Sequence, residues 1–458
     1  MGIQELLQEN ENKDLLRFLT CGSVDDGKST LIGRLLHDSK EIYEDHLQTL
    51  EKDSKRVGSA GDGIDFSLLL DGLKAEREQG ITIDVAYRYF STPQRKFIIA
   101  DCPGHEQYTR NMATGASTAN LAVVLIDARH GVVQQTRRHS FIASLLDIGH
   151  IIVAVNKMDL VDYSQEVFEK IRQDYRDFAA RLEVRNVHFI PISALEGDNV
   201  VESSKNMPWY RGMPMLEYLE TVHIASDRNL IDLRLPVQYV LRQDMEFRGF
   251  CGTVASGILR PGSEIKVLPS GKSTKIKSIH NFEGTLDEAY PPMAVTIATE
   301  DEVDISRGDM IVSPNNLPRV GQRFEAVLVW MNEDGLNPER PYRIKQGASE
   351  AQAQITKLRY RFDVNTIGRE EASTLELNEI GRVSLETNRS LAFDAYRRNR
   401  STGSFILIDP ITNATMAAGM ILDHRAEADM DAGKGSTNVI GHKSRVSKDD
   451  RLERLKQD

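Results

Sequence analysis

The residues from Gly22 to Ser29 read Gly-Ser-Val-Asp-Asp-Gly-Lys-Ser, which matches the phosphate-binding pattern G-x-x-x-x-G-K-[ST]. The glycines let the backbone curl so that its N–H groups point inward at anionic oxygens. Lys28 can reach the β- and γ-phosphates of a nucleotide, and the Ser29 hydroxyl is the kind of oxygen ligand that Mg²⁺ prefers. The pattern predicts a nucleoside triphosphate with Mg²⁺, contacted by Gly22, Ser23, Val24, Asp25, Asp26, Gly27, Lys28, Ser29 and Thr30.

A second group of residues, between positions 77 and 105, has the residue types needed to contact the γ-phosphate, Mg²⁺ and the attacking water. Thr82 can place its hydroxyl on Mg²⁺ and its N–H on the γ-phosphate. Asp101 is placed to hold Mg²⁺ through water, and the Gly104 N–H can approach the γ-phosphate because no side chain intervenes. His105 is placed to orient the attacking water. We predict catalytic roles for His105, Lys28 and Thr82, and the Mg²⁺ ligands Ser29, Thr82 and, through water, Asp101.

Two short sequences further along the chain specify the base. In Asn156-Lys157-Met158-Asp159, the Asp159 carboxylate can accept from both N1–H and the exocyclic amine of guanine, a pair that adenine lacks. Asn156 can bond the base and join neighbouring loops, and the Lys157 stem can cover the ring. Ser193 and Ala194 end a later apolar run, where the Ala194 N–H can meet guanine O6. The motifs together predict GTP.

The elements that must position these residues are recognisable from the pattern of apolar residues. Near-continuous apolar runs, typical of parallel strands covered on both faces, are found at 15–20, 121–126, 151–155 and 188–192. Residues 81–90 and 96–100 predict a hairpin at the edge of this sheet. Apolar residues recur at helical spacing from 167 to 182, and residues 30–36 predict a helix that begins at the phosphate loop.

The pattern of apolar residues changes after about residue 223. Short alternating runs, separated by Gly and Pro, continue to residue 323 and again to about residue 424, which favours antiparallel sheets. Few large apolar residues follow, so we expect a mobile end. The predicted fold is an α/β P-loop GTPase domain (14–223), two antiparallel β-barrel domains (224–323 and 324–424) and a mobile C-terminal tail (425–458).

Composition excludes several classes of protein. The 458 residues carry a net charge of −11, which argues against non-specific binding to nucleic acid or to an anionic membrane. No apolar run reaches the roughly 18 residues of a membrane span, and residues 1–13 lack the apolar core of a signal peptide. Cys21, Cys102 and Cys251 have no C-x-x-C spacing, which indicates a reducing compartment. We therefore expect a cytoplasmic protein with no membrane or nucleic-acid partner.

With these motifs in order and two barrels behind them, residues 14–423 resemble the translation-factor superfamily of GTPases, to which elongation factor Tu belongs. The stretches 101–105 and 111–116 are especially close to that group. Within the phosphate loop, however, Ser23-Val24-Asp25-Asp26 replaces the His-Val-Asp-His usual in elongation factors. This loop is similar to that of the GTPase subunit of sulfate adenylyltransferase, and the same similarity extends to 31–40, 42–45, 127–132 and 134–140.

The resemblance implies a partner, a smaller ATP-binding sulfate adenylyltransferase subunit that makes adenosine 5′-phosphosulfate from ATP and sulfate. Hydrolysis of GTP in the chain would drive that unfavourable step. The adenylyl-transfer residues are expected on the partner, because the chain shows no second nucleotide motif. The sequence at 441–444 is not a Gly-Lys-Ser loop, so a fused kinase is not expected.

Other interpretations remain open on the sequence. The basic stretches 357–361 and 397–400, with Tyr360 and Tyr396 in or beside them, give some support to an elongation-factor-like GTPase that carries aminoacyl-tRNA. The same stretches are more typical of a solvated barrel edge, and next of a face that docks a partner, because a chain with a net charge of −11 is a poor RNA binder. A stand-alone regulatory GTPase is a third interpretation. The insertion at 38–79 fits either a plain surface loop or a docking or switch element.

Overall fold

The computed structural model describes residues 13–39, 85–104, 109–182, 184–224, 229–242, 247–363 and 366–423. The described residues up to 422 belong to one compact unit. Thr82, His105, residues 40–79 of the predicted insertion and the predicted tail at 425–458 lie outside the described residues. Within the described residues, no helix is long and apolar enough to cross a membrane.

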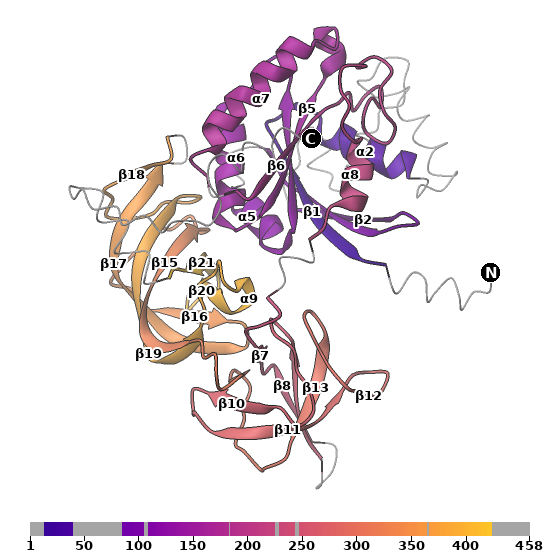
Figure 1. Cartoon of the computed structure of the whole chain (residues 1–458). Helices are drawn as coiled ribbons and strands as arrows, with labels where there is room; N and C mark the ends of the chain where they lie inside the picture. Colours follow the sequence, from indigo (N-terminus) through magenta and orange to yellow (C-terminus); the bar gives the residue numbers. More distant parts are fainter. Residues whose placement is uncertain are drawn as a thin grey trace, which may run out of the picture. The chain divides into compact units, whose positions relative to one another are not determined.

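The first sheet contains, among the described residues, six strands in the order β2-β3-β1-β4-β5-β6 (Figure 1). Their bounds are β1 (Leu15–Cys21), β2 (Ala86–Ser91), β3 (Lys96–Asp101), β4 (Leu121–Asp127), β5 (His150–Asn156) and β6 (Asn186–Pro191). All neighbours pair in parallel except β2, which pairs antiparallel with β3. The apolar runs thus form the predicted buried parallel strands, and the hairpin forms the predicted sheet edge.

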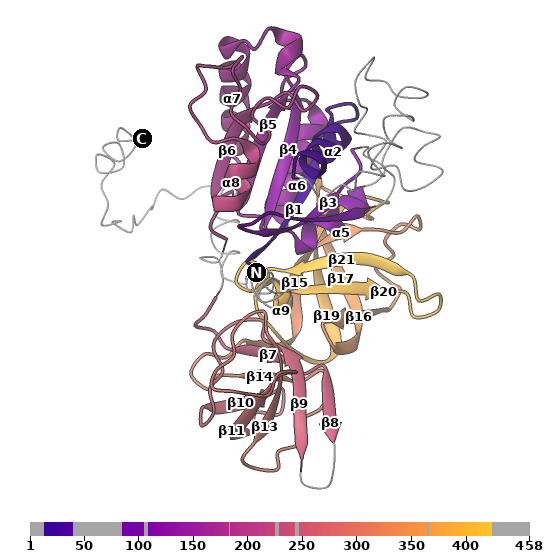
Figure 2. The same ribbon diagram turned by 90° about the vertical axis from the view of Figure 1, so that its right-hand side faces the viewer.

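Helices cover both faces of this sheet, as Figures 1 and 2 show. One face packs against α2 (Lys28–Asp38) and α8 (Met215–Thr221), and the other against α5 (Thr109–Thr118), α6 (Gln134–Leu145) and α7 (Gln165–Ala179). Every residue of β4 is buried, because successive side chains alternate between the two cores. The predicted helical stripe from 167 to 182 forms most of α7, and it buries Phe168, Ile171, Tyr175 and Phe178.

The second and third sheets are antiparallel, as the sequence predicts. The second has the described order β7-β14-β10-β11-β13-β9-β8, with β12 paired to β11. Its strands are β7 (Arg234–Pro236), β8 (Tyr239–Arg242), β9 (Arg248–Thr253), β10 (Glu264–Leu268), β11 (Ser273–His280), β12 (Thr285–Leu286), β13 (Ala294–Thr299) and β14 (Met310–Val312). Alternating side chains such as Ile265, Val267, Ile276 and Ile279 fill one shared core.

The third sheet closes on itself, because β16 pairs with both β17 and β20. The described ring runs β16-β20-β21-β15-β19-β17, and β18 extends it from β17. Its elements are β15 (Arg319–Trp330), β16 (Tyr342–Gln346), β17 (Ser349–Asp363), β18 (Gly368–Glu370), β19 (Ile380–Phe393), α9 (Arg400–Gly403), β20 (Ser404–Ile408) and β21 (Thr415–Ile421). Because the ring is closed, each of its six strands pairs with a neighbour on both sides.

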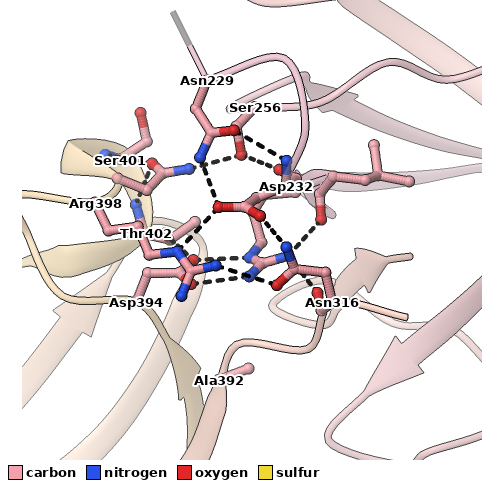
Figure 3. Close-up of polar contacts among 12 residues, drawn as sticks. Asn229, Asp232, Ser256, Asn316, Ala392, Asp394, Arg398, Ser401 and Thr402 are labelled. Atoms are coloured by element: carbon pink, nitrogen blue, oxygen red, sulfur yellow. Dashed lines mark hydrogen bonds and ion pairs between the residues drawn. The ribbon is translucent and has the colours of Figure 1, made fainter. Parts of the chain in front are cut away.

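A buried ion pair joins the second and third sheets (Figure 3). The Arg234 guanidinium, which is fully buried, donates to both carboxylate oxygens of Asp394 at 2.8 and 2.9 Å. Around it, Arg398 Nε donates to Asp232 Oδ2 at 2.9 Å and Asn399 Nδ2 donates to Ser256 Oγ at 2.9 Å. Such bidentate pairs fix orientation as well as position, so these contacts hold the two sheets in a defined register.

Candidate functional site

Most of the predicted site residues lie where the parallel strands of the first sheet end, at their carboxyl ends. Gly22 follows β1, Asp101 ends β3 and Asn156 ends β5. Strand register then places Asp127, at the end of β4, directly beside Asn156. Loops at the carboxyl ends of parallel strands are where α/β sheets bind their ligands. The first sheet therefore assembles one candidate site from segments that are far apart in the sequence.

The phosphate loop has the tight conformation that its glycines predict. Gly27 has a φ of 89°, and a Cβ added there would lie 2.4 Å from Asn156 Nδ2. The Lys28 ammonium lies within the loop, where it donates to the carbonyl oxygens of Gly22 at 3.2 Å and Ser23 at 2.7 Å. Burial lowers the pKa of Lys28, while the carboxylates of Asp101 and Asp26 oppose this shift. The loop thus holds a buried cation among backbone groups.

Gly104 lies against this cation. A Cβ at position 104 would lie 2.6 Å from Lys28 Nζ and 2.7 Å from the Gly22 carbonyl oxygen. Asp101 is buried beside them and accepts from Thr20 Oγ1 at 3.3 Å. Asp101 and Gly104 therefore lie next to the phosphate loop, as the sequence predicts, and the side chain of Ser29 is partly exposed at the start of α2.

Asp26 stabilises the loop from within. Its Oδ2 accepts from the backbone N–H of Ser23 at 2.5 Å. Burial raises the pKa of this carboxyl, and the hydrogen bond from Ser23 and the charge of Lys28 counteract that rise. Asp25, with a φ of 65°, and Val24 are exposed at the tip of the loop.

The Asn156 amide joins the phosphate loop to the loop after β6. Its Nδ2 donates to the Asp26 carbonyl oxygen at 2.7 Å, and its Oδ1 accepts from the Ala194 N–H at 2.9 Å. The side chain is 2% exposed. The predicted role of Asn156 in joining loops is present in the structure, and Ala194 N–H, predicted to meet guanine, is here bonded to Asn156.

The remaining residues predicted to contact the base lie close by. Asp159 lies in the short 3-10 helix Met158–Val161 and is partly exposed. Ser193 is buried, and its Oγ accepts from the Glu196 N–H at 3.2 Å. A partly exposed carboxylate three positions after the loop-joining Asn156 suits recognition of the edge of a base.

Asp127 and Arg129 form a second part of the site that motif reasoning missed. Asp127 is 2% exposed, and its two carboxylate oxygens accept from Arg129 Nε at 3.0 Å and Nη2 at 2.7 Å. Lys157 Nζ lies 3.1 Å from Asp127 and also donates to the Asp25 carbonyl oxygen. Burial favours the neutral acid, but the hydrogen bonds from Arg129 and Lys157 outweigh it and hold the pKa of Asp127 well below its usual range. Its place at the end of β4, beside other site-bearing strand ends, was the signal available in the sequence.

The described residues fit a metal that is held mainly by nucleotide and water oxygens. No cluster of three or more His, Cys, Asp or Glu side chains that could hold a metal occurs in the described ranges. Mg²⁺ usually binds through one or two protein ligands together with substrate phosphates. Ser29, the residue after Lys28, and Asp101, whose charge acts on Lys28, carry oxygens of that kind.

Fold and site together define a P-loop nucleotide-binding protein with two antiparallel β domains behind it. The family model for the elongation factor Tu GTP binding domain matches residues 13–232, that for elongation factor Tu domain 2 matches residues 251–312, and that for GTP-eEF1A C-terminal domain-like sequences matches residues 323–422. The first domain is therefore a GTP-binding domain of the elongation factor Tu class.

The chain belongs to the sulfate adenylyltransferase subunit 1 family. It is 60% identical to sulfate adenylyltransferase subunit 1 of Bacteroides fragilis, over 94% of this chain and 90% of that protein. It is 58% identical to the protein of the same name in Alteromonas mediterranea, over 93% of this chain and 90% of the relative. It is also 62% identical to the bifunctional enzyme CysN/CysC of Rhodopirellula baltica, over 92% of this chain but 65% of that longer protein.

Proposed function

We propose that this protein is the GTPase subunit of a heteromeric ATP sulfurylase, which couples GTP hydrolysis to the synthesis of adenosine 5′-phosphosulfate from ATP and sulfate. One observation carries the proposal: the chain matches sulfate adenylyltransferase subunit 1 of Bacteroides fragilis over nearly its whole length. The hydrogen bonds by which Asn156 joins the phosphate loop to the loop after β6 support a nucleotide site between these two loops.

Residues around the loop are assigned to the parts of GTP. Backbone N–H groups from Gly22 to Thr30 and the Lys28 ammonium would bind the phosphates, and Asp159 with Ala194 would bind guanine. Ser29, Thr82 and, through water, Asp101 would hold Mg²⁺, which when bound neutralises charge on the phosphate oxygens. The close approach of Gly104 to Lys28 supports this placement, because a bare backbone N–H there can reach the γ-phosphate.

Hydrolysis follows from positioning and electrostatics. His105 would orient water for in-line attack on the γ-phosphoryl group. As the bond to the leaving oxygen breaks, negative charge would develop on the β-phosphate, which Lys28 and the loop N–H groups would contact. Burial of Lys28 strengthens its interaction with that charge, because the local dielectric is low.

The partner is proposed to be the smaller subunit, which binds ATP and carries the adenylyl-transfer residues. Loss of the γ-phosphate would release the Thr82 and Asp101–His105 segments and so change how the chain contacts that subunit. A contact between α5 and the third-sheet region could transmit a rearrangement of the first domain to the rest of the chain. The backbone N–H of Arg110, on α5, donates to Asn378 Oδ1 of the closed barrel at 3.0 Å.

A role in carrying aminoacyl-tRNA has less support. In the basic stretch 357–361, Arg359 pairs with Glu325 at 2.7 Å. Arg361 pairs with Glu370 at 2.7 Å and with Glu379 at 2.5 Å. These arginines are neutralised within the barrel, so they offer little net charge to a phosphate backbone.

Reconstitution tests the proposal. The purified chain is mixed with a small ATP-binding subunit, and GTP hydrolysis is followed with and without ATP and sulfate. We expect GTP hydrolysis to rise only when the subunit, ATP and sulfate are all present. One adenosine 5′-phosphosulfate should form for each GTP that is hydrolysed. Tight GTP-dependent binding of aminoacyl-tRNA, with no response to sulfate, would reject the proposal in favour of the translation class.

A variant tests the catalytic assignment separately. His105→Ala should slow GTP hydrolysis by about 10²-fold or more, as expected for loss of a group that positions water, and leave GTP affinity nearly unchanged. His223→Ala is a suitable control, because His223 is exposed after α8, away from the residues of the candidate site. Equal losses of binding and hydrolysis in His105→Ala would make the residue structural.

A further inference from the structure

Arg34 on α2 contacts the turn that follows β6, residues 193–197. Its Nε donates to the Ala194 carbonyl oxygen at 3.2 Å, and its Nη2 donates to the Leu195 carbonyl oxygen. The guanidinium also lies close to Gly197, where an added Cβ would be 3.6 Å from Arg34 Cζ. The Arg34 side chain is 17% exposed, so it is largely enclosed by these contacts. One planar cation therefore holds two successive carbonyl groups of the turn.

The turn is also held by contacts of its own and by Asn156. The Glu196 N–H donates to Ser193 Oγ at 3.2 Å, and the Gly197 N–H donates to the Ser193 carbonyl oxygen at 2.8 Å. The Ala194 N–H donates to Asn156 Oδ1 at 2.9 Å. Both backbone groups of Ala194 are thus engaged, its N–H by Asn156 and its carbonyl by Arg34.

The N–H group that these contacts leave available is that of Leu195. Among the described residues, no group accepts a hydrogen bond from it. The Leu195 N–H and the Ala194 carbonyl belong to one planar peptide unit, in which the two groups point in opposite directions when the unit is trans. This unit is trans. A donor that fixes the Ala194 carbonyl therefore also fixes the direction of the Leu195 N–H.

We propose that Arg34 is a positioning residue for the base, because it aims the Leu195 N–H at the O6 atom of guanine. The inference rests on the proposed binding of guanine beside Asp159. It refines the base contact predicted from the sequence, since the Ala194 N–H is engaged by Asn156 and the next N–H along the turn is available. A carbonyl oxygen such as O6 is the acceptor that a lone backbone N–H requires.

Arg34 also connects the base to the phosphates through α2. It lies six positions after Lys28, the first residue of the helix, which is about 9 Å along the helix axis. The same helix thus carries the cation of the phosphate loop at its start and the guanidinium that orients the turn. A guanidinium suits this role because its fixed fork can donate to two carbonyls at once, whereas an ammonium is a single point of charge.

Equilibrium titration with two nucleotides tests this role. The full chain with Mg²⁺ is titrated with GDP and with 2-aminopurine riboside 5′-diphosphate, which has hydrogen where guanine has O6. The analogue also lacks N1–H, but that difference is the same for every variant and cancels in the comparison. A residue that acts through O6 must affect GDP much more than the analogue, whereas a general loss of structure weakens both alike.

Two substitutions at position 34 and one control complete the experiment. Arg34→Met keeps the length of the side chain but removes its donors, and it should weaken GDP binding about tenfold and leave the affinity for the analogue nearly unchanged. Arg34→Lys keeps a charged donor and should recover part of the GDP affinity. Arg181→Met is the matched control, because Arg181 is exposed after the end of α7, and it should change neither affinity.

Three results would overturn the role of Arg34. They are an unchanged GDP affinity in Arg34→Met, an equal loss for both diphosphates, and an Arg34→Lys variant that binds GDP no more tightly than Arg34→Met. The failure of this inference can be told from that of the proposed function. A wild-type chain that does not bind GDP would reject the guanine site and with it both proposals, whereas any of the three results with normal wild-type binding rejects the role of Arg34 alone.

Discussion

Asn156 Nδ2 donates to the Asp26 carbonyl oxygen at 2.7 Å, although the two residues are 130 positions apart in the chain. The other end of the same amide accepts from Ala194, a further 38 positions along. One side chain thus satisfies a carbonyl in the phosphate loop and an N–H in the loop after β6. Because the group is buried, water cannot replace either contact without opening the site.

We expect Asn156→Ala to destabilise the fold and the nucleotide complex together. It leaves two buried backbone groups unpaired, at about 1–3 kcal/mol each. The urea midpoint should fall, and GTP affinity should fall at least about tenfold. Asn315→Ala, at an exposed position, is the control and should change neither quantity. An unchanged urea midpoint in Asn156→Ala would mean that the amide does not brace the loops.

A second prediction concerns the base. Asp159→Asn replaces an acceptor pair with one acceptor and one donor, which suits the carbonyl at position 2 of xanthine. Preference should shift from GTP towards xanthosine triphosphate, and GTP affinity should fall by about tenfold or more. Competition binding with both nucleotides measures the shift. Unchanged GTP affinity would remove Asp159 from the base site.

The buried pair between the two β domains gives a third prediction. Arg234→Met leaves Asp394 buried without its cation, which typically costs about 3–5 kcal/mol. The double variant Arg234→Met/Asp394→Leu removes both charges and should recover most of the loss. Urea unfolding of the single and double variants measures the difference. A double variant as unstable as Arg234→Met would show that packing, and not the uncompensated charge, causes the loss.

The fourth prediction concerns acid stability. His139 on α6 is 3% exposed, and burial, assisted by the charges of Lys28 and Arg138, lowers its pKa from 6.5 to about 3. Between those values the unfolded chain binds a proton that the folded chain does not, so stability falls as pH falls from 6.5 towards 3. Between pH 7.5 and pH 5 this proton should cost wild type about 2 kcal/mol.

His139→Gln removes that titration without adding charge. Free energies of unfolding measured at pH 7.5 and pH 5 should therefore differ less in the variant than in wild type. Other titrating groups contribute equally to both proteins, so the comparison isolates His139. Parallel losses in the two proteins would show that His139 is protonated in the folded state at pH 5.

Much of the first domain could be predicted from local patterns. Residues 121–126 are apolar at every position, which is typical of a strand covered on both faces, and the structure buries all of β4. The phosphate loop follows from its glycines, since Gly27 has the positive φ that its place requires. In such cases the cause of the structure lies within a few residues of sequence.

Contacts between distant residues could not be predicted in this way. Arg234 and Asp394 are 160 positions apart, and neither belongs to a recognisable motif. Asp127 belongs to none of the nucleotide motifs, and its partner Lys157 approaches it only through the pairing of β4 with β5. The stretch 397–400, which is typical of a solvated edge, is divided by the fold between buried Asn399 and exposed Arg397.

The ring of the third sheet, as described, is closed by β16, which pairs with both β17 and β20. A strand that is paired on both sides has no row of unpaired backbone N–H and C=O groups to which a foreign strand could add. A protein that docks on the wall of this barrel must therefore be recognised through side chains and not by extension of the sheet.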